Sequence, residues 1–209
     1  MFWLILAIVL WGIIHSLLAS LGLKDFLRRT LGNGFMRFYR LLYNLFAVVS
    51  LAPALYLMFS LPNTTLYRVP VPWSYLMLTG QGISVLLLFA AVLQTDVLAF
   101  VGLRQLFAEE KGDLVKNGLY RIVRHPLYTF SLSILWLSPS MSMNSFVVYV
   151  ALTAYILIGI IFEERKLLRE FGQEYAHYRS VTPMLIPGLS KIPPRRGNGV
   201  GTNNFLGPS

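Results

Sequence analysis

The chain has 209 residues, of which 56% are hydrophobic and 13% charged, and its mean hydropathy of +0.61 excludes an ordinary soluble domain of this length. The absence of cysteine excludes disulfides, thiolate metal sites and cysteine nucleophiles. The net charge of +9 could indicate nucleic acid, but in a membrane chain it is typical of cytoplasmic loops beside anionic lipid, so we expect membrane lipid and no nucleic acid as partners.

Long uncharged segments predict the membrane spans in chain order. Met1 to Leu23 is the first, because a bilayer core needs roughly 20 apolar residues in a helix. Leu41 to Leu61 is the second span and Trp73 to Leu93 forms the core of the third. The 37 uncharged residues from Pro126 to Phe162 suffice for a helical hairpin, with its turn at Ser138 to Ser145. The sequence therefore predicts an all-α, polytopic integral membrane protein of about five transmembrane helices with a C-terminal helical hairpin.

Basic residues lie on alternate sides of these five spans. Seventeen of the 18 follow the first, third or fifth span, and only Arg68 lies elsewhere. By the positive-inside rule we expect the N-terminus outside and the C-terminus in the cytoplasm. Residues 190–209 are rich in Pro, Gly and Asn and lack a periodic apolar face. We therefore expect one membrane domain over residues 1–189, with a cytoplasmic cap, and a disordered tail over residues 190–209.

Polar residues gather at the cytoplasmic ends of the predicted hairpin. Arg124, His125 and Tyr128 stand at the start of its first helix, and Glu163 and Glu164 at the end of its second. Antiparallel helices of similar length would bring these ends side by side. The group could form the mouth of a functional pocket, or it could anchor the helices at the lipid headgroups, where Arg and Tyr often lie.

Two sequence blocks favour the functional reading. They are GLYRIVRHPLY (Gly118 to Tyr128) and EERKLLREFGQEYAHYRSVTPMLIP (Glu163 to Pro187). In this order, flanking a hairpin, they closely resemble the membrane methyltransferases related to isoprenylcysteine carboxyl methyltransferase. The upstream blocks resemble the bacterial methanethiol S-methyltransferase branch, and they read HSLLASLGLKDFLRRTLGNGFMRFYRLLYN, DVLAFVGLRQ, WLSPSMS and TAYILIGIIFEER. The N-terminal part also resembles membrane proteins associated with nitric-oxide metabolism and carotenoid isomerisation, some of which hold haem.

The resemblance implies a cytoplasm-facing site for S-adenosyl-L-methionine, without a metal. The cofactor-binding positions that it implies are Gln105, Gly112, Asp113, Leu114, Val115, Tyr120, His125, Pro126, Leu127, Tyr128 and Glu163. These residue types suit the ligand, because a glutamate accepts hydrogen bonds from a ribose diol and an ammonium group. Arg124 or His125 can meet the ligand's carboxylate.

One departure from the resemblance concerns the methyl acceptor. The carboxyl-methylating relatives carry an arginine one helical turn before the paired glutamates, and here that position is Gly159. A carboxylate acceptor would lack its charge partner, which favours a small thiol such as methanethiol, with Arg124 as the catalytic residue that favours the thiolate by lowering its pKa. Gly159 could instead serve close helix packing. A prenylcysteine carboxylate or a phospholipid amine is the alternative, lipid-soluble acceptor.

His15 lies inside the first predicted span. An ionisable side chain there is a functional candidate, although a neutral imidazole bonded to a neighbouring helix is the simpler reading. Through the resemblance to the nitric-oxide-associated proteins it could also be a haem ligand. A haem-binding redox or isomerase-like membrane protein is therefore the alternative from another functional class.

Overall fold

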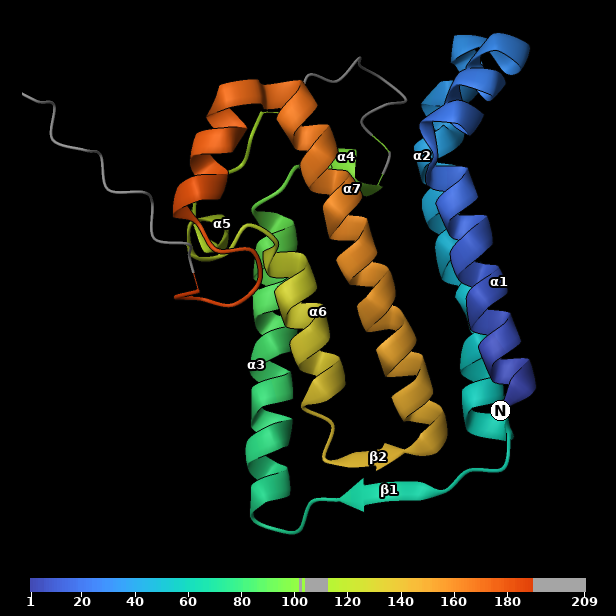
Figure 1. Cartoon of the computed structure of the whole chain (residues 1–209), viewed down its shortest axis with the longest axis vertical. Coiled ribbons are helices and arrows are strands. Elements are labelled where there is room, and N and C mark those ends of the chain that lie inside the picture. Colours follow the sequence, from blue (N-terminus) through green and yellow to red (C-terminus); the bar gives the residue numbers. More distant parts are fainter. Residues whose placement is uncertain (102, 104–112, 190–209) are drawn as a thin grey trace, which may run out of the picture.

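Helices dominate the computed structural model, which describes residues 1–101, 103 and 113–189 (Figure 1). The predicted tail, Gln105 and Gly112 lie outside the described residues. In chain order the elements are α1 (Phe2–Ala19), α2 (Leu21–Ser60), β1 (Thr65–Arg68), α3 (Trp73–Leu93), α4 (Val97–Val101), α5 (Leu119–Ile122), α6 (Pro126–Trp136), β2 (Ser140–Ser142) and α7 (Met143–Val181).

Four of the described helices, α1, α2, α3 and α7, are long and apolar enough to cross a membrane. Only 11 to 17% of the residues in their most apolar windows are buried inside the protein. The remaining apolar side chains face outward, which is favourable only where lipid replaces water. The chain is therefore an all-α, polytopic integral membrane protein, as the sequence predicts.

The fourth predicted span is shorter than expected. Helix α6 has 11 residues, about 16 Å of rise against a hydrocarbon core of about 30 Å. The helix ends at Trp136, Leu137 forms a turn, and Ser140–Ser142 then pair antiparallel with Thr65–Arg68. The turn lies within the predicted range, and Ser142 caps α7 by accepting from the amide of Ser145 at 3.2 Å. The hairpin is present, but its first arm is an 11-residue helix and its turn contains a three-residue strand.

The two long kinked helices explain how the predicted cap is built. Helix α2 has 40 residues and includes the basic segment before the second predicted span, with a kink at Gly32. Helix α7 has 39 residues and folds back at Gly172, where φ is +52° and ψ is −124°. Glycine adopts such a backbone conformation without steric cost. The fold-back returns the end of α7 toward the starts of α5 and α6 (Figure 1).

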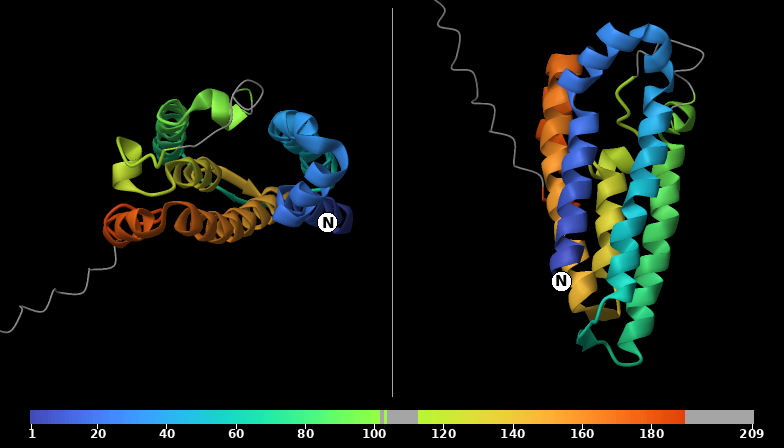
Figure 2. Two further views of the ribbon diagram at one scale, coloured as in Figure 1. Left: turned by 90° about the horizontal axis from the view of Figure 1, so that it is seen from above. Right: turned by 90° about the vertical axis from the view of Figure 1, so that its right-hand side faces the viewer.

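Two helix groups surround the centre of the bundle. Helices α1 and α2 pack together on one side and α3 and α6 on the other, while α7 runs between the groups (Figure 2). A small apolar core of Leu4, Ile8, Ala54, Met58 and Val148 joins α1, α2 and α7 near the end that carries the strands. The polar residues of the predicted site lie toward the opposite end of the bundle.

Candidate functional site

The start of α6 is fixed by the chain segment that follows α7. The amide of Arg124 donates to the carbonyl of Pro183 at 2.8 Å, and the amide of His125 donates to that of Met184 at 3.2 Å. The hydroxyl of Thr129 donates to the carbonyl of Leu185 at 2.9 Å. These bonds hold residues 182–185 beside the residues that precede and open α6, so that two parts of the sequence about 60 residues apart form one wall.

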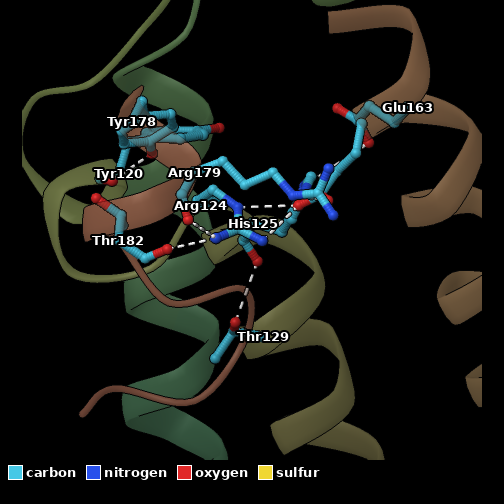
Figure 3. Close-up of polar contacts among 9 residues, drawn as sticks. Tyr120, Arg124, His125, Thr129, Glu163, Tyr178, Arg179 and Thr182 are labelled. Atoms are coloured by element: carbon cyan, nitrogen blue, oxygen red, sulfur yellow. Dashed lines mark hydrogen bonds and ion pairs between the residues drawn. The ribbon is translucent and has the colours of Figure 1, made fainter. Parts of the chain in front are cut away.

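Arg124 is the centre of a buried polar network (Figure 3). Its Nε and one terminal nitrogen donate to Glu164 Oε1 at 2.9 and 2.6 Å. Its other terminal nitrogen donates to the carbonyls of Arg179, at 3.0 Å, and Thr182. The Arg124 and Glu164 side chains are only 8% and 9% exposed. The guanidinium is therefore largely occupied by protein groups, and it ties α6, α7 and the following segment together.

Adjacent glutamates on α7 have different surroundings. Glu164 completes the network, with Arg179 Nε 3.3 Å from its Oε2 and His125 Nε2 3.4 Å from its Oε1. Glu163 points elsewhere, and its side chain is 42% exposed. Its Oε2 is nonetheless covered, has no hydrogen-bond partner among the described residues, and lies 3.8 Å from His125 Nδ1. Residues one apart on a helix diverge by about 100°, so one glutamate serves the network and the other remains available to a ligand.

A cavity of about 940 Å³ lies beside this network. Every predicted site residue that the structure describes lines it, namely Asp113, Leu114, Val115, Tyr120, Arg124, His125, Pro126, Leu127, Tyr128 and Glu163. They come from the segment before α5, from α5, from the start of α6 and from α7. The predicted residues thus converge on one volume of the size expected for a small-molecule site. Their individual binding roles stay predictions.

Tyr120 forms part of the cavity wall through the fold-back of α7. The hydroxyl of Tyr178 donates to the carbonyl of Tyr120 at 2.5 Å, and Lys116 pairs with Glu174 at 2.5 Å. Burial, with a smaller effect of the Glu163 carboxylate, raises the pKa of Tyr120 to about 12. The phenol therefore stays neutral at physiological pH and can both donate and accept a hydrogen bond.

Gly118 positions α5 against α3. Its φ of +60° suits glycine, and a Cβ there would collide with the side-chain amide of Gln94. The Gln94 Oε1 atom accepts a hydrogen bond from the amide of Leu119 at 2.8 Å, so the residue that follows α3 fixes the first residue of α5. This contact sets the position of the Tyr120 side of the cavity.

Part of the cavity wall comes from residues that the sequence did not single out. On α7 these are Leu167, Phe171, Tyr175 and Tyr178, and on α2 they are Arg40 and Asn44. Leu167 and Phe171 follow Glu163 at intervals of four, which is the spacing of one helix face and could have revealed them, whereas Tyr175 and Tyr178 reach the cavity after the fold-back at Gly172. No comparable pattern marks the two α2 residues.

The described residues do not support a packing role for Gly159. A Cβ built at Gly159 would meet none of their atoms within 4 Å, so no described helix approaches closely there. His15, by contrast, does line the cavity, from α1. The same cavity therefore extends from the predicted cofactor residues to the first helix.

Curated relatives match part of the chain. Methanethiol S-methyltransferase 2 of Bradyrhizobium diazoefficiens is 40% identical over 110 residues, which are 50% of this chain and 42% of the relative. Methanethiol S-methyltransferase of Pseudomonas deceptionensis is 41% identical over 75 residues, or 36% of this chain and 29% of the relative. Methanethiol S-methyltransferase of Mycobacterium tuberculosis is 35% identical over 92 residues, or 41% of this chain and 38% of the relative. The matches thus span less than half the length of these relatives. No solved structure matches the chain significantly.

A family model extends the similarity over the whole described bundle. The model described as NnrU protein matches residues 3–189, which include all the described helices and strands except the first residue of α1. The chain belongs to the NnrU protein family and is similar to methanethiol S-methyltransferases.

Proposed function

We propose that this protein is an S-adenosyl-L-methionine-dependent membrane methyltransferase that methylates a small thiol such as methanethiol. The observation that carries the proposal is the convergence of ten predicted residues, from segments far apart in the sequence, on one cavity of about 940 Å³. The names of the relatives support a thiol acceptor, and these relatives are 35 to 41% identical to this chain over matches of 75 to 110 residues.

The unpartnered polar atoms in the cavity suit S-adenosyl-L-methionine as the methyl donor. Glu163 Oε2 and the Tyr175 hydroxyl are buried, have no hydrogen-bond partner among the described residues, and belong to residues that line the cavity. Such atoms are costly unless a ligand pairs with them. A carboxylate can accept from a ribose diol or an ammonium group, and Tyr128 and Tyr120 supply apolar ring surface beside it.

Methyl transfer depends mainly on alignment. The bound cofactor supplies an electrophilic methyl group on a positively charged sulfur. The protein must hold the acceptor in line with that group and exclude water from the reaction. In this proposal the cofactor is bound and oriented by Tyr120, Tyr128 and Glu163. The cavity wall is made apolar by Leu114, Val115 and Leu127.

For Arg124 we propose a role that differs from the one considered from the sequence alone. Its guanidinium donates to Glu164 and to two main-chain carbonyls, and Glu164 balances its charge. We propose that Arg124 is a positioning residue that holds His125 and the 182–185 segment in place. A separate group must then receive the proton of a thiol acceptor.

The test begins with binding of S-adenosylhomocysteine to the purified protein by calorimetry. Labelled methyl transfer to methanethiol and to N-acetyl farnesylcysteine follows in parallel assays. We expect volatile dimethyl sulfide from the first and little product from the second, because Gly159 offers no charge to a carboxylate. Faster methylation of the farnesyl compound would make a prenylcysteine carboxylate the acceptor. A Soret band without cofactor binding would favour a haem protein.

A further inference from the structure

An aromatic group surrounds His15 at the α1 side of the cavity. The Trp11 and His15 rings stack with centroids 5.0 Å apart and 18° between their planes. Tyr155 of α7 meets His15 edge-on at 5.6 Å, and the Tyr43 hydroxyl of α2 lies 2.5 Å from His15 Nε2. We call these four residues, Trp11, His15, Tyr43 and Tyr155, the His15 cluster. Three helices contribute to it, although none of the predicted cofactor residues does.

The two ring nitrogens of His15 differ, because Nε2 is hydrogen-bonded to the Tyr43 hydroxyl and Nδ1 has no such partner among the described residues. The residue is 9% exposed and lines the cavity, and its Nδ1 is buried with no hydrogen-bond partner among the described residues. Buried histidines that only support a fold normally satisfy both nitrogens. In the tautomer that donates Nε2–H to Tyr43, Nδ1 keeps a lone pair that can accept a proton.

Among the residues that the structure describes, the ring contacts of His15 are all aromatic. The titratable side chains against it are Tyr43 from α2 and Tyr155 from α7. The charged side chains that line the same cavity are Arg40, Asp96, Asp113, Arg124 and Glu163. The His15 cluster is therefore an aromatic pocket in which His15 Nδ1 is the proton acceptor. The charged side chains belong to the other walls of the cavity.

We infer that the His15 cluster is the acceptor end of the cavity and that His15 Nδ1 receives the proton of the thiol. This inference rests on the proposed function. Aromatic faces bind sulfur favourably at about 5 Å, and they offer nothing to a carboxylate. As the thiol sulfur forms its bond to the methyl carbon, its S–H bond breaks and the proton moves to Nδ1. The carbon–sulfonium bond breaks with its electron pair remaining on the departing sulfur, which leaves two neutral thioethers and a protonated imidazole.

The first test replaces His15 by glutamine, which can still bond Tyr43 but cannot take up a proton. We expect the kcat for methanethiol to fall by about 100-fold or more, as for loss of a general base. Binding of S-adenosylhomocysteine should stay within about threefold, because the predicted cofactor residues are untouched. In the wild type the rate should rise with pH and level off once His15 is neutral, whereas in His15→Gln it should keep rising with the thiolate. His177→Gln is the matched control, because His177 is exposed outside the cavity, and it should change nothing.

A second measurement does not depend on turnover. Dimethyl sulfide added to the protein loaded with S-adenosylhomocysteine should change the tryptophan fluorescence through Trp11, and the change should disappear in Trp11→Phe. His15→Ala should regain at least tenfold in kcat when imidazole is added. Failure of the wild type to bind S-adenosylhomocysteine would overturn the proposed function and this inference with it. A His15→Gln protein with wild-type kcat and pH profile, a fluorescence change that persists in Trp11→Phe, or an absence of imidazole rescue would overturn this inference alone.

Discussion

Glu163 and Glu164 are adjacent in the sequence, yet their replacement should have opposite consequences. In Glu164→Gln the Arg124 guanidinium, only 8% exposed, keeps its charge but loses the carboxylate 2.6 Å away. Breaking a buried ion pair on one side costs about 3 to 5 kcal/mol of stability. We therefore expect Glu164→Gln to lower the melting temperature of the purified protein strongly.

Glu163→Gln should instead leave stability almost unchanged. Its side chain is 42% exposed, and its ion pair with His125 is long at 3.8 Å. A charge-assisted hydrogen bond to the cofactor contributes about 1.5 to 3 kcal/mol, so its loss should weaken S-adenosylhomocysteine binding by about 10- to 150-fold. The exposed pair of Lys166 and Glu170, at 3.9 Å, provides the control, and Glu170→Gln should change neither property.

Two measurements on the same three variants decide the matter. Thermal unfolding in detergent reports stability, and calorimetry with S-adenosylhomocysteine reports cofactor binding. Equal losses of binding in Glu163→Gln and Glu164→Gln, or a Glu164→Gln protein as stable as the wild type, would refute the division of roles between the two glutamates.

Three further outcomes are expected. Gly172→Ala should cost about 1 to 3 kcal/mol of stability, because φ is +52° there, while Gly159→Ala in open space should be tolerated in the same thermal melts. The pKa of Tyr120 is raised from 10.0 to about 12, so the contribution of its neutral phenol to stability should be complete below pH 10 and be lost as the pH rises through 12. A difference absorbance titration against Tyr120→Phe checks this, and a phenolate signal from Tyr120 near pH 10 would contradict it. Reporter fusions should place the N-terminus outside and the C-terminus in the cytoplasm, and reporters in one compartment would show a miscounted span.

The main features of the fold could be predicted from local sequence properties. Uncharged length reveals α1, α3 and the apolar parts of α2 and α7, because lipid tolerates only apolar side chains around a helix. The early end of α6 could not be predicted in this way. It depends on the pairing of β2 with β1, whose residues lie more than 70 positions apart and carry no distinctive pattern.

Part of the candidate site could also be predicted from the sequence. The hairpin brings Arg124 and the two glutamates together, and helix geometry separates the directions of Glu163 and Glu164. The internal partners of Arg124 were not predictable, because they reach it only through the fold-back at Gly172 and the return of residues 182–185. The face that His15 presents to the cavity depends on the packing of three helices, which no local pattern specifies.

The hydrogen-bonded ladder between β1 and β2 makes one end of the bundle more rigid than the other. At that end, main-chain bonds link the loop between α2 and α3 to the loop between α6 and α7, and the Asn144 side-chain amide donates to the carbonyls of Met58 and Leu61 at 3.3 Å. Ends tied by the backbone cannot separate without breaking several hydrogen bonds together. Any widening of the cavity would therefore pivot about the strand end, and its amplitude would grow toward the opposite end of the bundle, where Arg124 and Glu164 lie. Amide hydrogen exchange should accordingly be slowest at the ladder and increase along each helix away from it.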